Sequence, residues 1–260
     1  MPKGSPELTE ARKNEIIDAC EKLYQTMSFK EIILKDISRE TTFTRTSIYN
    51  YFQTKEEIFL ALFKREYDRW NEELTELLLK NDYLSREDIA DRIAVSLQNR
   101  PQLLKLLSMN NYDMEANSRP ELLKEFKISY GNSIKTVTQI LEKFCPEMKP
   151  VEIQNFIYMF FPFMFGIYPY TSVTEKQQTA MKEADIDYTY QSVYEITHTC
   201  LLGLLGVKTL PIIGVTKENQ VLDAVKAVNV VLTEEETSKL EQTADSFGLN
   251  VIRFWEKEMK

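Results

Sequence analysis

The first half of the chain contains almost no glycine or proline. The 260 residues include 7 glycines and 9 prolines, yet no glycine lies between Ser5 and Tyr130 and no proline between Glu7 and Arg100. Proline breaks helices, and glycine favours turns that a helix cannot make. Nothing in this stretch forces a long break in helical structure, so the sequence predicts that the chain begins as consecutive helices.

Cysteine and histidine are also scarce. The three cysteines, Cys20, Cys145 and Cys200, are odd in number, far apart and set among apolar residues, which is typical of reduced thiols in a cytosolic protein. No CxxC or zinc spacing exists, and a Ser-His-Asp site would have to use the single histidine, His198. We therefore expect no metal, no cofactor and no enzymatic activity.

Positive charge is in the minority. The chain has 32 Lys and Arg against 40 Asp and Glu, a net charge of -8 and a pI of about 5.0, which gives no support for a general polyanion binder. Any contact with nucleic acid must therefore be local. Through Glu56, nine Lys and Arg balance nine Asp and Glu, so the N-terminal segment is the least acidic part of the chain.

Targeting and membrane-spanning segments are not expected. The N-terminal residues MPKGSPELTEARK lack the apolar region of a signal peptide. The stretch from Ile153 to Thr174 is uncharged and aromatic, but Pro162 and Pro169 interrupt it, whereas a spanning helix needs about 20 predominantly apolar residues. We expect a cytoplasmic protein without a membrane partner, in which this stretch is buried core.

Apolar residues recur at helical spacing near the N-terminus. Ile16, Cys20, Leu23 and Met27 define one face of a helix from about Thr9 to Met27. Partners for this face are expected on two short helices and a longer fourth one: Ile37, Ile48, Phe52, Ile58, Leu60 and Phe63. The run Thr54-Lys55-Glu56-Glu57 is a capping box, in which Thr and Glu satisfy the first free amides, and it predicts the start of that fourth helix, which runs to about Lys80.

The rest of the chain is punctuated by proline. Breaks at 100–101, 118–120, 145–146 and 149–150 mark off further helices, among them 121–144 and 151–165. After Gly206 the pattern changes to a short strand at 210–213, a helix, an extended stretch at 228–232 and a capped helix from Thr233 to about Phe247. We expect an all-α protein with a small mixed α/β C-terminal extension, divided into domains 1–56, 57–206 and 207–260.

The segment around residues 44–51 has the character of a DNA-reading helix. Two short helices joined by a tight turn, the second carrying small polar and cationic groups, fit the major groove. With Thr44 as N-cap, helical spacing puts Arg45 with Tyr49, and Thr46 with Asn50, on the outer side, while Ile48 and Phe52 turn to the core. On spacing alone, the solvated face of an ordinary helical bundle fits equally well.

Each polar group on this helix has a possible partner on DNA. Arg45 suits a guanine edge or a phosphate, Asn50 suits adenine, and the Thr46 methyl suits thymine. The hydroxyls of Tyr49 and Tyr51 suit phosphate oxygens. Lys55 and the free amides that start the fourth helix form a second site for a phosphate. Lys35 is expected to contact DNA from the other side.

The stretch FKEIILKDISRETTFTRTSIYNYF, residues 29–52, followed by TKEEIFLAL from Thr54, closely resembles the signature of the TetR family of transcription regulators. The resemblance implies a helix-turn-helix homodimer on a palindromic operator and a C-terminal domain for a small effector. It assigns the DNA-facing set by position: Thr44, Arg45, Thr46, Ser47, Tyr49, Asn50, Tyr51 and Lys55. Two residues depart from the family pattern, because Thr42 stands where Gly is usual and Ile33 where a capping Thr is common.

The aromatic segment 156–170 has two interpretations. It is either plain core or dimer interface, or part of a pocket for an apolar or aromatic effector. The pocket hypothesis uses Met109, Met114, Phe126, Tyr130, Phe156, Met159, Phe160, Phe163 and Met164. The resemblance places the dimer on the last two family helices, here about 151–165 and 187–205, and we interpret His198 as a core or interface residue rather than a pH sensor.

The tail has a resemblance of its own. LPIIGVTKENQVLDAVKAVNVVLTEEETSKLEQTA, residues 210–244, looks like the C-terminal end of aldo/keto reductases, and Thr216, Lys217 and Gln220 match positions that hold the phosphate of NADP. Gln220 stands where that family often has Arg, which weakens the grip. A reductase barrel would need about 250 residues, so we expect a fused remnant that packs on the regulator or extends its dimer.

These observations favour a bacterial repressor of TetR type, released from DNA by a small apolar or aromatic effector. A nicotinamide-sensing regulator or oxidoreductase-derived fusion is the alternative that the tail suggests. A protein that organises DNA without controlling a promoter is a third.

Overall fold

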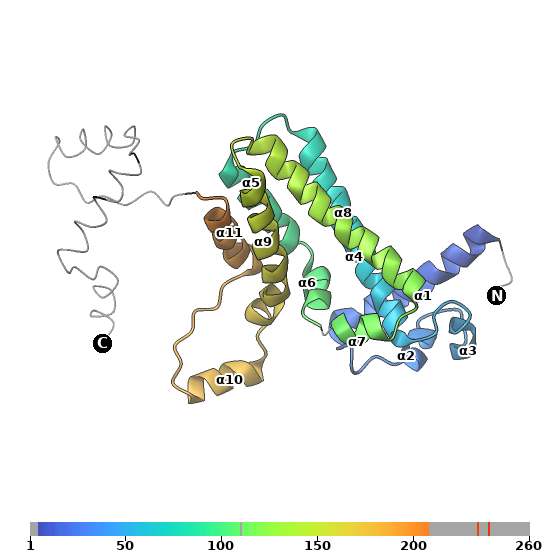
Figure 1. Ribbon diagram of the computed structural model, residues 1–260. Coiled ribbons are helices and arrows are strands. Elements are labelled where there is room, and N and C mark those ends of the chain that lie inside the picture. The colour runs from blue at the N-terminus through green and yellow to red at the C-terminus, as the bar shows by residue number, and fades with distance from the viewer. Residues whose placement is uncertain (1–4, 110, 208–232, 234–238, 240–260) are drawn as a thin grey trace. The chain divides into compact units, whose positions relative to one another are not determined.

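The structure is a computed structural model that describes residues 5–109 and 111–207, together with Thr233 and Lys239 (Figure 1). Nearly all of these residues belong to the first of two units of the chain, residues 1–208. Within the described residues there are eleven helices and no strand, which confirms the all-α prediction. The expected α/β extension, including Thr216, Lys217 and Gln220, lies outside the described residues.

Three helices form the N-terminal part. α1 spans Pro6–Thr26, α2 spans Leu34–Arg39 and α3 spans Arg45–Ile48. α1 starts earlier than predicted, because Ser5 accepts the Leu8 amide at 3.3 Å and Pro6 suits the first turn. Of the predicted core residues in this part, Ile16, Cys20, Ile37, Ile48 and Phe52 are buried, and Leu23 and Met27 are partly buried.

The long helix α4, Lys55–Lys80, starts and ends where predicted. The Thr54 side chain accepts the amide of Glu57 at 3.1 Å, which confirms the cap. The other half of the predicted capping box differs, because Glu57 accepts the amide of Gln53 at 2.7 Å. The carboxylate of Glu57 thereby reaches one residue beyond the cap.

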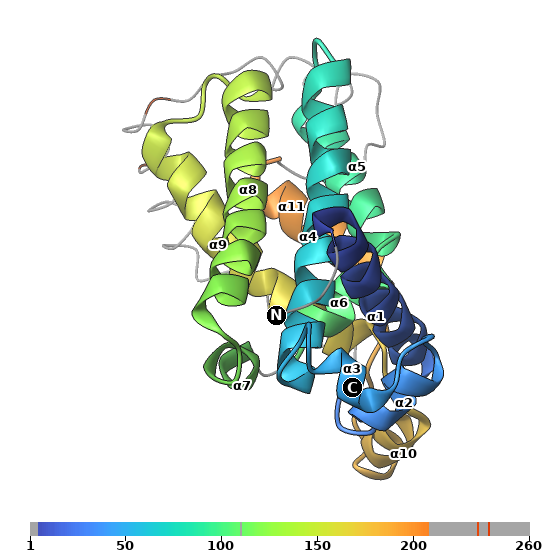
Figure 2. The same cartoon turned by 90° about the vertical axis from the view of Figure 1, so that its right-hand side faces the viewer.

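Seven helices follow α4. They are α5 (Arg86–Gln98), α6 (Pro101–Leu107), α7 (Asn111–Ala116), α8 (Pro120–Phe144), α9 (Pro150–Thr171), α10 (Glu175–Glu183) and α11 (Val193–Leu204). α4 and α8 lie side by side along most of their length (Figures 1 and 2). α11 packs against α5 and α9, whereas α10 stands away from the body and has no buried residue (Figure 1).

The proline breaks were predicted well with one exception. Pro101, Pro120 and Pro150 each occupy the first turn of a helix, where the missing amide costs nothing. The prediction that α9 ends near Phe165 was wrong: the helix passes through Pro162 and Pro169 to Thr171. Buried residues on both sides of Pro162, such as Phe160 and Met164, keep the helix packed across the lost hydrogen bond.

No single helix within the described ranges has the length and apolar composition to cross a membrane. Only α9 and α10 taken together, bent by 82° to each other, reach that composition. In the same residues, no group of three or more His, Cys, Asp or Glu side chains is placed to hold a metal ion.

Candidate nucleic-acid interface

The second helix of the predicted helix-turn-helix is a single turn. α3 spans Arg45–Ile48, shorter than the predicted 44–51, and Tyr49 follows as its C-cap in helical conformation. Thr44 is the N-cap, as predicted, and its hydroxyl accepts the amide of Ser47 at 3.3 Å. So short a helix has little stability of its own, and its position depends on the contacts at its ends and on its buried side.

Most of the predicted DNA-binding residues share the outer surface of this unit. Arg45 and Tyr49 lie together, since Nη2 of Arg45 donates to the Tyr49 hydroxyl at 3.3 Å. On the opposite side Ile48 is 0% exposed and Phe52 is 1% exposed, so they anchor the turn in the core. The exposed members are Lys35, Thr44, Arg45, Thr46, Tyr49 and Asn50, and Ser47 is half-buried.

Tyr51 and Lys55, by contrast, are engaged within the protein. Tyr51 is 6% exposed, and its hydroxyl accepts a hydrogen bond from Arg12 at 3.0 Å. Nζ of Lys55 lies 3.9 Å from the centroid of the Phe29 ring and donates to the Phe29 carbonyl at 2.6 Å, and burial lowers the pKa of this amine. In this structure the polar group of each residue contacts α1 or the loop after it, and the expectation that both contact phosphates stays a prediction.

The turn between α2 and α3 is held from α1. Oε1 of Glu15 accepts the Thr42 amide at 2.6 Å and the Thr42 hydroxyl at 2.8 Å. Among the described residues only Asp185 and Gly206 have positive φ, so Thr42 escapes the strain that a glycine would have relieved. Ile33 caps α2 without a side-chain bond, and Asp36 accepts its amide at 3.2 Å instead.

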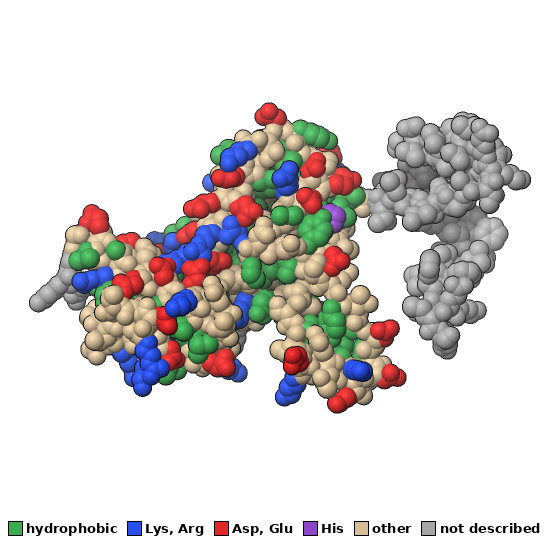
Figure 3. Space-filling view, turned by 180° about the vertical axis from the view of Figure 1, so that it is seen from behind, with side chains coloured by type: hydrophobic (Ala, Val, Ile, Leu, Met, Phe, Trp, Pro, Cys, Tyr) green, Lys and Arg blue, Asp and Glu red, His purple; other side chains and the backbone are tan. Residues whose placement is uncertain are grey.

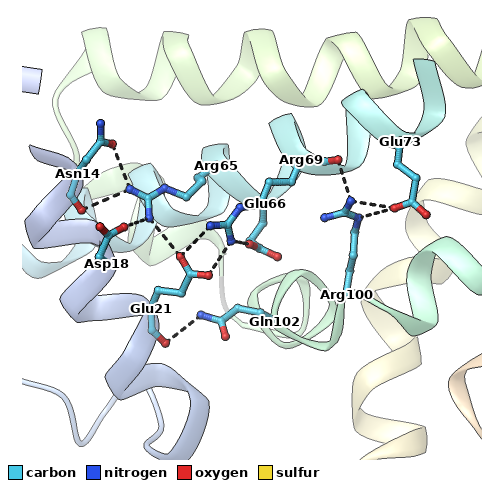
Figure 4. A network of polar contacts seen from close by, with 9 residues as sticks. All are labelled: Asn14, Asp18, Glu21, Arg65, Glu66, Arg69, Glu73, Arg100 and Gln102. Atoms are coloured by element: carbon cyan, nitrogen blue, oxygen red, sulfur yellow. Dashed lines mark hydrogen bonds and ion pairs between the residues drawn. The ribbon is translucent and has the colours of Figure 1, made fainter. Parts of the chain in front are cut away.

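A network of ion pairs ties α1 to α4 (Figure 4). Arg65 reaches Asp18 and Glu21 on α1, the latter at 3.1 Å. Arg69 pairs with both Glu21 and Glu66 at 2.6 Å. Burial alone would raise the pKa of Glu21, but the hydrogen bonds from the two arginines outweigh it and the pKa is lowered.

α6 is fastened to the C-terminal end of α1. Nζ of Lys105 donates to the carbonyls of Tyr24 at 2.6 Å and Met27 at 3.0 Å, and the Tyr24 hydroxyl donates back to the Lys105 carbonyl at 3.3 Å. These carbonyls belong to the last turn of α1, where a cation is favourable. A cleft of about 510 Å³ lies beside this contact, between α1, α4, α6 and Tyr168 of α9.

The helix-turn-helix, residues 34–52, is hereafter the reading unit. A third junction joins its end to the start of α8. Glu57 is 1% exposed and accepts from Arg119, through Nε at 2.7 Å and Nη2 at 2.9 Å. Nη2 of Arg119 also donates to the Tyr51 carbonyl at 3.0 Å. Sequence reasoning missed this junction because Arg119 stood out only as part of a helix break, and nothing local connects it to Glu57.

Most of the predicted effector residues pack against one another or against α4 instead of lining a cavity. Phe126 lies 4.8 Å from Phe63, and Tyr130 lies 5.6 Å from Tyr67, between ring centroids. Phe156 and Phe160 form a second pair at 5.5 Å. Met114 and Met164 are buried, Met109 and Phe163 are partly buried, and Met159 is 51% exposed. The structure therefore brings most of this set into one aromatic core and leaves Met159 outside.

A mostly apolar groove of about 630 Å³, which sequence reasoning did not identify, lies between α8 and α9. Its lining includes Ile134, Thr138, Cys145, Met148, Ile153, Ile157 and Tyr158. Ile134 lies one turn after Tyr130 on α8, and Ile157 lies one turn before Phe161 on α9. The groove thus adjoins the aromatic core.

The stretch 153–174 was predicted to be buried core, yet part of α9 is exposed in the single chain. Val151 is 56% exposed, Tyr158 71% and Phe165 39%, so one apolar side of α9 is uncovered. On α11, His198 stacks on Tyr194 with ring centroids 5.1 Å apart. Figure 3 shows hydrophobic side chains gathered beside this histidine.

The fold and the interface together define a two-part helical protein, in which a small helix-turn-helix is joined by a long helix to a larger helical body. Residues 16–62 match the model of the tetR family of bacterial regulatory proteins, and residues 64–206 match the tetracyclin repressor-like C-terminal domain. The chain belongs to the TetR family of bacterial regulatory proteins, not to a family of enzymes.

One curated relative is an uncharacterised helix-turn-helix transcriptional regulator, YdgC, from Bacillus subtilis. It is 32% identical over 95 residues, which are 36% of this chain and 48% of that protein, so the alignment spans about half of the relative. The family match ends at residue 206, and these matches do not support the resemblance of the tail to aldo/keto reductases.

Two solved structures share the fold. A TetR-family regulator from Mesorhizobium loti has a TM-score of 0.51 at 13% identity, with 75% of this chain and 97% of that chain covered. PfmR from Thermus thermophilus has a TM-score of 0.51 at 10% identity, with 75% and 99% covered. At such low identity the likeness concerns the fold alone.

Proposed function

We propose that the chain is a sequence-specific DNA-binding transcription regulator that binds a palindromic operator as a homodimer and is released by a small apolar or aromatic effector. The observation that carries the proposal is the exposed polar side of a short helix whose opposite side is locked in the core by Ile48 and Phe52. Membership of a family of bacterial regulators supports it. A repressor of this kind acts on DNA and therefore in the cytoplasm.

The reading surface is assigned to residues whose polar side chains are exposed or half-buried. Arg45 and Tyr49 would contact a base edge and a phosphate, with Thr46 and Asn50 beside them. Lys35, Thr44 and Ser47 complete the set, whereas Tyr51 and Lys55 support it from within. We place the DNA-binding part in residues 1–56 and the effector and dimer part in 57–206.

The dimer is proposed to form through α9 and α11. Tyr158 and Phe165 present apolar surface on α9, and Ile196, Cys200 and Leu204 on α11 are only partly buried. A second copy of the chain would cover this surface and bring two reading helices to one duplex. Each helix would then meet one half of a palindrome.

The effector site is proposed on the α8–α9 side of the core. The groove lined by Ile134 and Ile157 adjoins the aromatic residues Tyr130 and Phe160, which match an apolar or aromatic ligand. Pairing of the rings across α4 and α8 means that a ligand entering there would disturb the contact between these two helices.

The tail carries a separate hypothesis. Thr216, Lys217 and Gln220 would hold the phosphate of a nicotinamide cofactor if the reductase resemblance extended to binding. Titration of the protein with NADPH, followed by fluorescence, tests this alternative. A saturable change supports cofactor sensing, and a flat response removes it.

A gel-shift assay tests the proposed DNA contact, with duplex DNA from upstream of the gene and a non-specific duplex of equal length. Arg45→Ala and Tyr49→Ala should each weaken specific binding by about tenfold or more, because each removes a base or phosphate contact. Arg92→Ala and Tyr83→Ala, exposed residues outside the reading unit, are matched controls and should bind like the wild type. Equal binding by all four variants would overturn the assignment.

A further inference from the structure

The backbone between the reading helix and α4 is gripped by a residue from the distant body. Arg119 immediately precedes α8, and 62 residues separate it from Glu57 at the start of α4. Its guanidinium donates to both carboxylate oxygens of Glu57, at 2.7 Å and 2.9 Å. A fork of two parallel bonds fixes orientation as well as distance.

Both partners of this pair also hold backbone atoms beside Phe52. Nη2 of Arg119 donates to the Tyr51 carbonyl at 3.0 Å, and Oε2 of Glu57 accepts the Gln53 amide at 2.7 Å. Phe52, between these two residues, is the 1% exposed anchor of the reading unit. The path of the chain as it leaves the reading helix is therefore set by the Glu57–Arg119 pair.

Two further bonds make the junction a continuous connection. Oε1 of Glu57 also accepts the backbone amide of Arg119 at 3.1 Å, and the Thr54 hydroxyl donates to the Asn117 carbonyl at 3.0 Å. Burial alone would raise the pKa of Glu57, but the hydrogen bonds from Arg119 and Gln53 outweigh it, so the pKa is lowered and the carboxylate stays charged at neutral pH.

α8 links this junction to the aromatic core. Arg119 directly precedes this helix, and Phe126 lies about two turns later, packed 4.8 Å from Phe63 of α4. α4 and α8 are the two helices that meet along the core, so any shift of α8 against α4 changes the Arg119–Glu57 distance. A four-residue helix cannot resist such a change by its own stability.

We propose that Arg119 is a positioning residue for DNA reading: it couples the first turn of α8 to the orientation of the exposed side of α3. The inference rests on the proposed DNA-binding function. It names α8, through the Glu57–Arg119 pair, as a route by which the body of the protein sets the reading helix.

Arg119→Lys is the test variant, because lysine keeps the charge and loses the fork. Arg86→Lys is the matched control: Arg86 likewise holds a carboxylate, Glu147, at 2.6 Å and a backbone carbonyl, that of Leu205, but at the start of α5. The two arginine side chains are 39% and 32% exposed, but Glu147 is 57% exposed whereas Glu57 is 1% exposed, so the control pair is the more solvated one.

The measurement is the ratio of specific to non-specific DNA affinity, for a duplex enriched from a random library by the wild-type chain and a scrambled duplex. Arg119→Lys should lower this ratio by about tenfold while non-specific affinity stays within about twofold, since phosphate contacts tolerate misorientation better than base contacts. Arg86→Lys should leave the ratio unchanged and lower Tm less, because its partner Glu147 is more exposed than Glu57. A merely structural role of Arg119 would lower Tm in Arg119→Lys and leave its ratio unchanged, which overturns the proposal.

Amide hydrogen exchange provides a readout that needs no DNA. Arg119→Lys should raise exchange at Gln53 and along 48–53 with little change in α5, and Arg86→Lys should do the reverse. Unchanged exchange at 48–53 in Arg119→Lys also overturns the proposal. If the wild-type chain enriches no duplex, the proposed function fails, whereas the exchange result still decides the coupling.

Discussion

Two tyrosines separated by one residue have opposite surroundings. Tyr49 is 43% exposed and shares a hydrogen bond with Arg45, so its ring and hydroxyl are available to DNA. Tyr51 is 6% exposed, and its hydroxyl accepts a hydrogen bond from Arg12. Burial therefore leaves Tyr49 exposed for the proposed DNA contact and places Tyr51 within the fold.

Glu57 offers a residue-scale test of the junction through pH. Its pKa is lowered in the folded state from the ordinary value of 4.5, so its stabilisation is complete above that value and is lost as pH falls through the folded-state pKa. Glu57→Gln should cost about 3 kcal/mol at pH 7, because Arg119 loses its charged partner. Urea unfolding across pH 3 to 7 should show a shallower acid decline in this variant.

A control for that measurement is Glu76→Gln. Glu76 forms an exposed pair with Lys80, which contributes little to stability. If Glu57→Gln lowers the free energy of unfolding at pH 7 no more than this control does, the Glu57–Arg119 pair does not stabilise the fold as its geometry suggests.

At the scale of helices, the sequence predicted where a helix begins better than where it ends. Thr54 specifies the start of α4 and Pro120 that of α8, because capping and proline chemistry are local. The run of α9 through Pro162 could not be predicted, since packing of Phe160 and Met164 on either side outweighs the lost bond. The Glu57–Arg119 pair was equally out of reach, because only the folded arrangement of α4 and α8 joins them.

α9 also carries the element-scale prediction. Phe165→Glu places a charge on the proposed dimer surface, where Phe165 is 39% exposed, and should shift the protein to a monomer at micromolar concentration. Sedimentation velocity measures this. Tyr83→Glu, at a residue 76% exposed before α5, should leave the wild-type assembly intact. A dimer that persists in Phe165→Glu argues for a different interface.

At the scale of the whole molecule, three junctions fasten the reading unit to the body. The α1–α4 ion pairs, the Lys105 contact of α6 and the Glu57–Arg119 pair approach it from different helices (Figure 4 shows the first). Because these junctions come from different helices, a shift of one helix against another would alter how the reading unit is held. These three junctions hold the exposed polar side of α3, on which the proposed DNA binding depends.

The most direct test is enrichment of duplexes from a random library by the full-length chain, followed by sequencing of the bound pool. We expect an inverted repeat whose half-sites lie about one helical turn apart, roughly 10 base pairs centre to centre, and loss of that enrichment with Arg45→Ala. A pool with no common sequence, or one that Arg45→Ala enriches equally well, would contradict it.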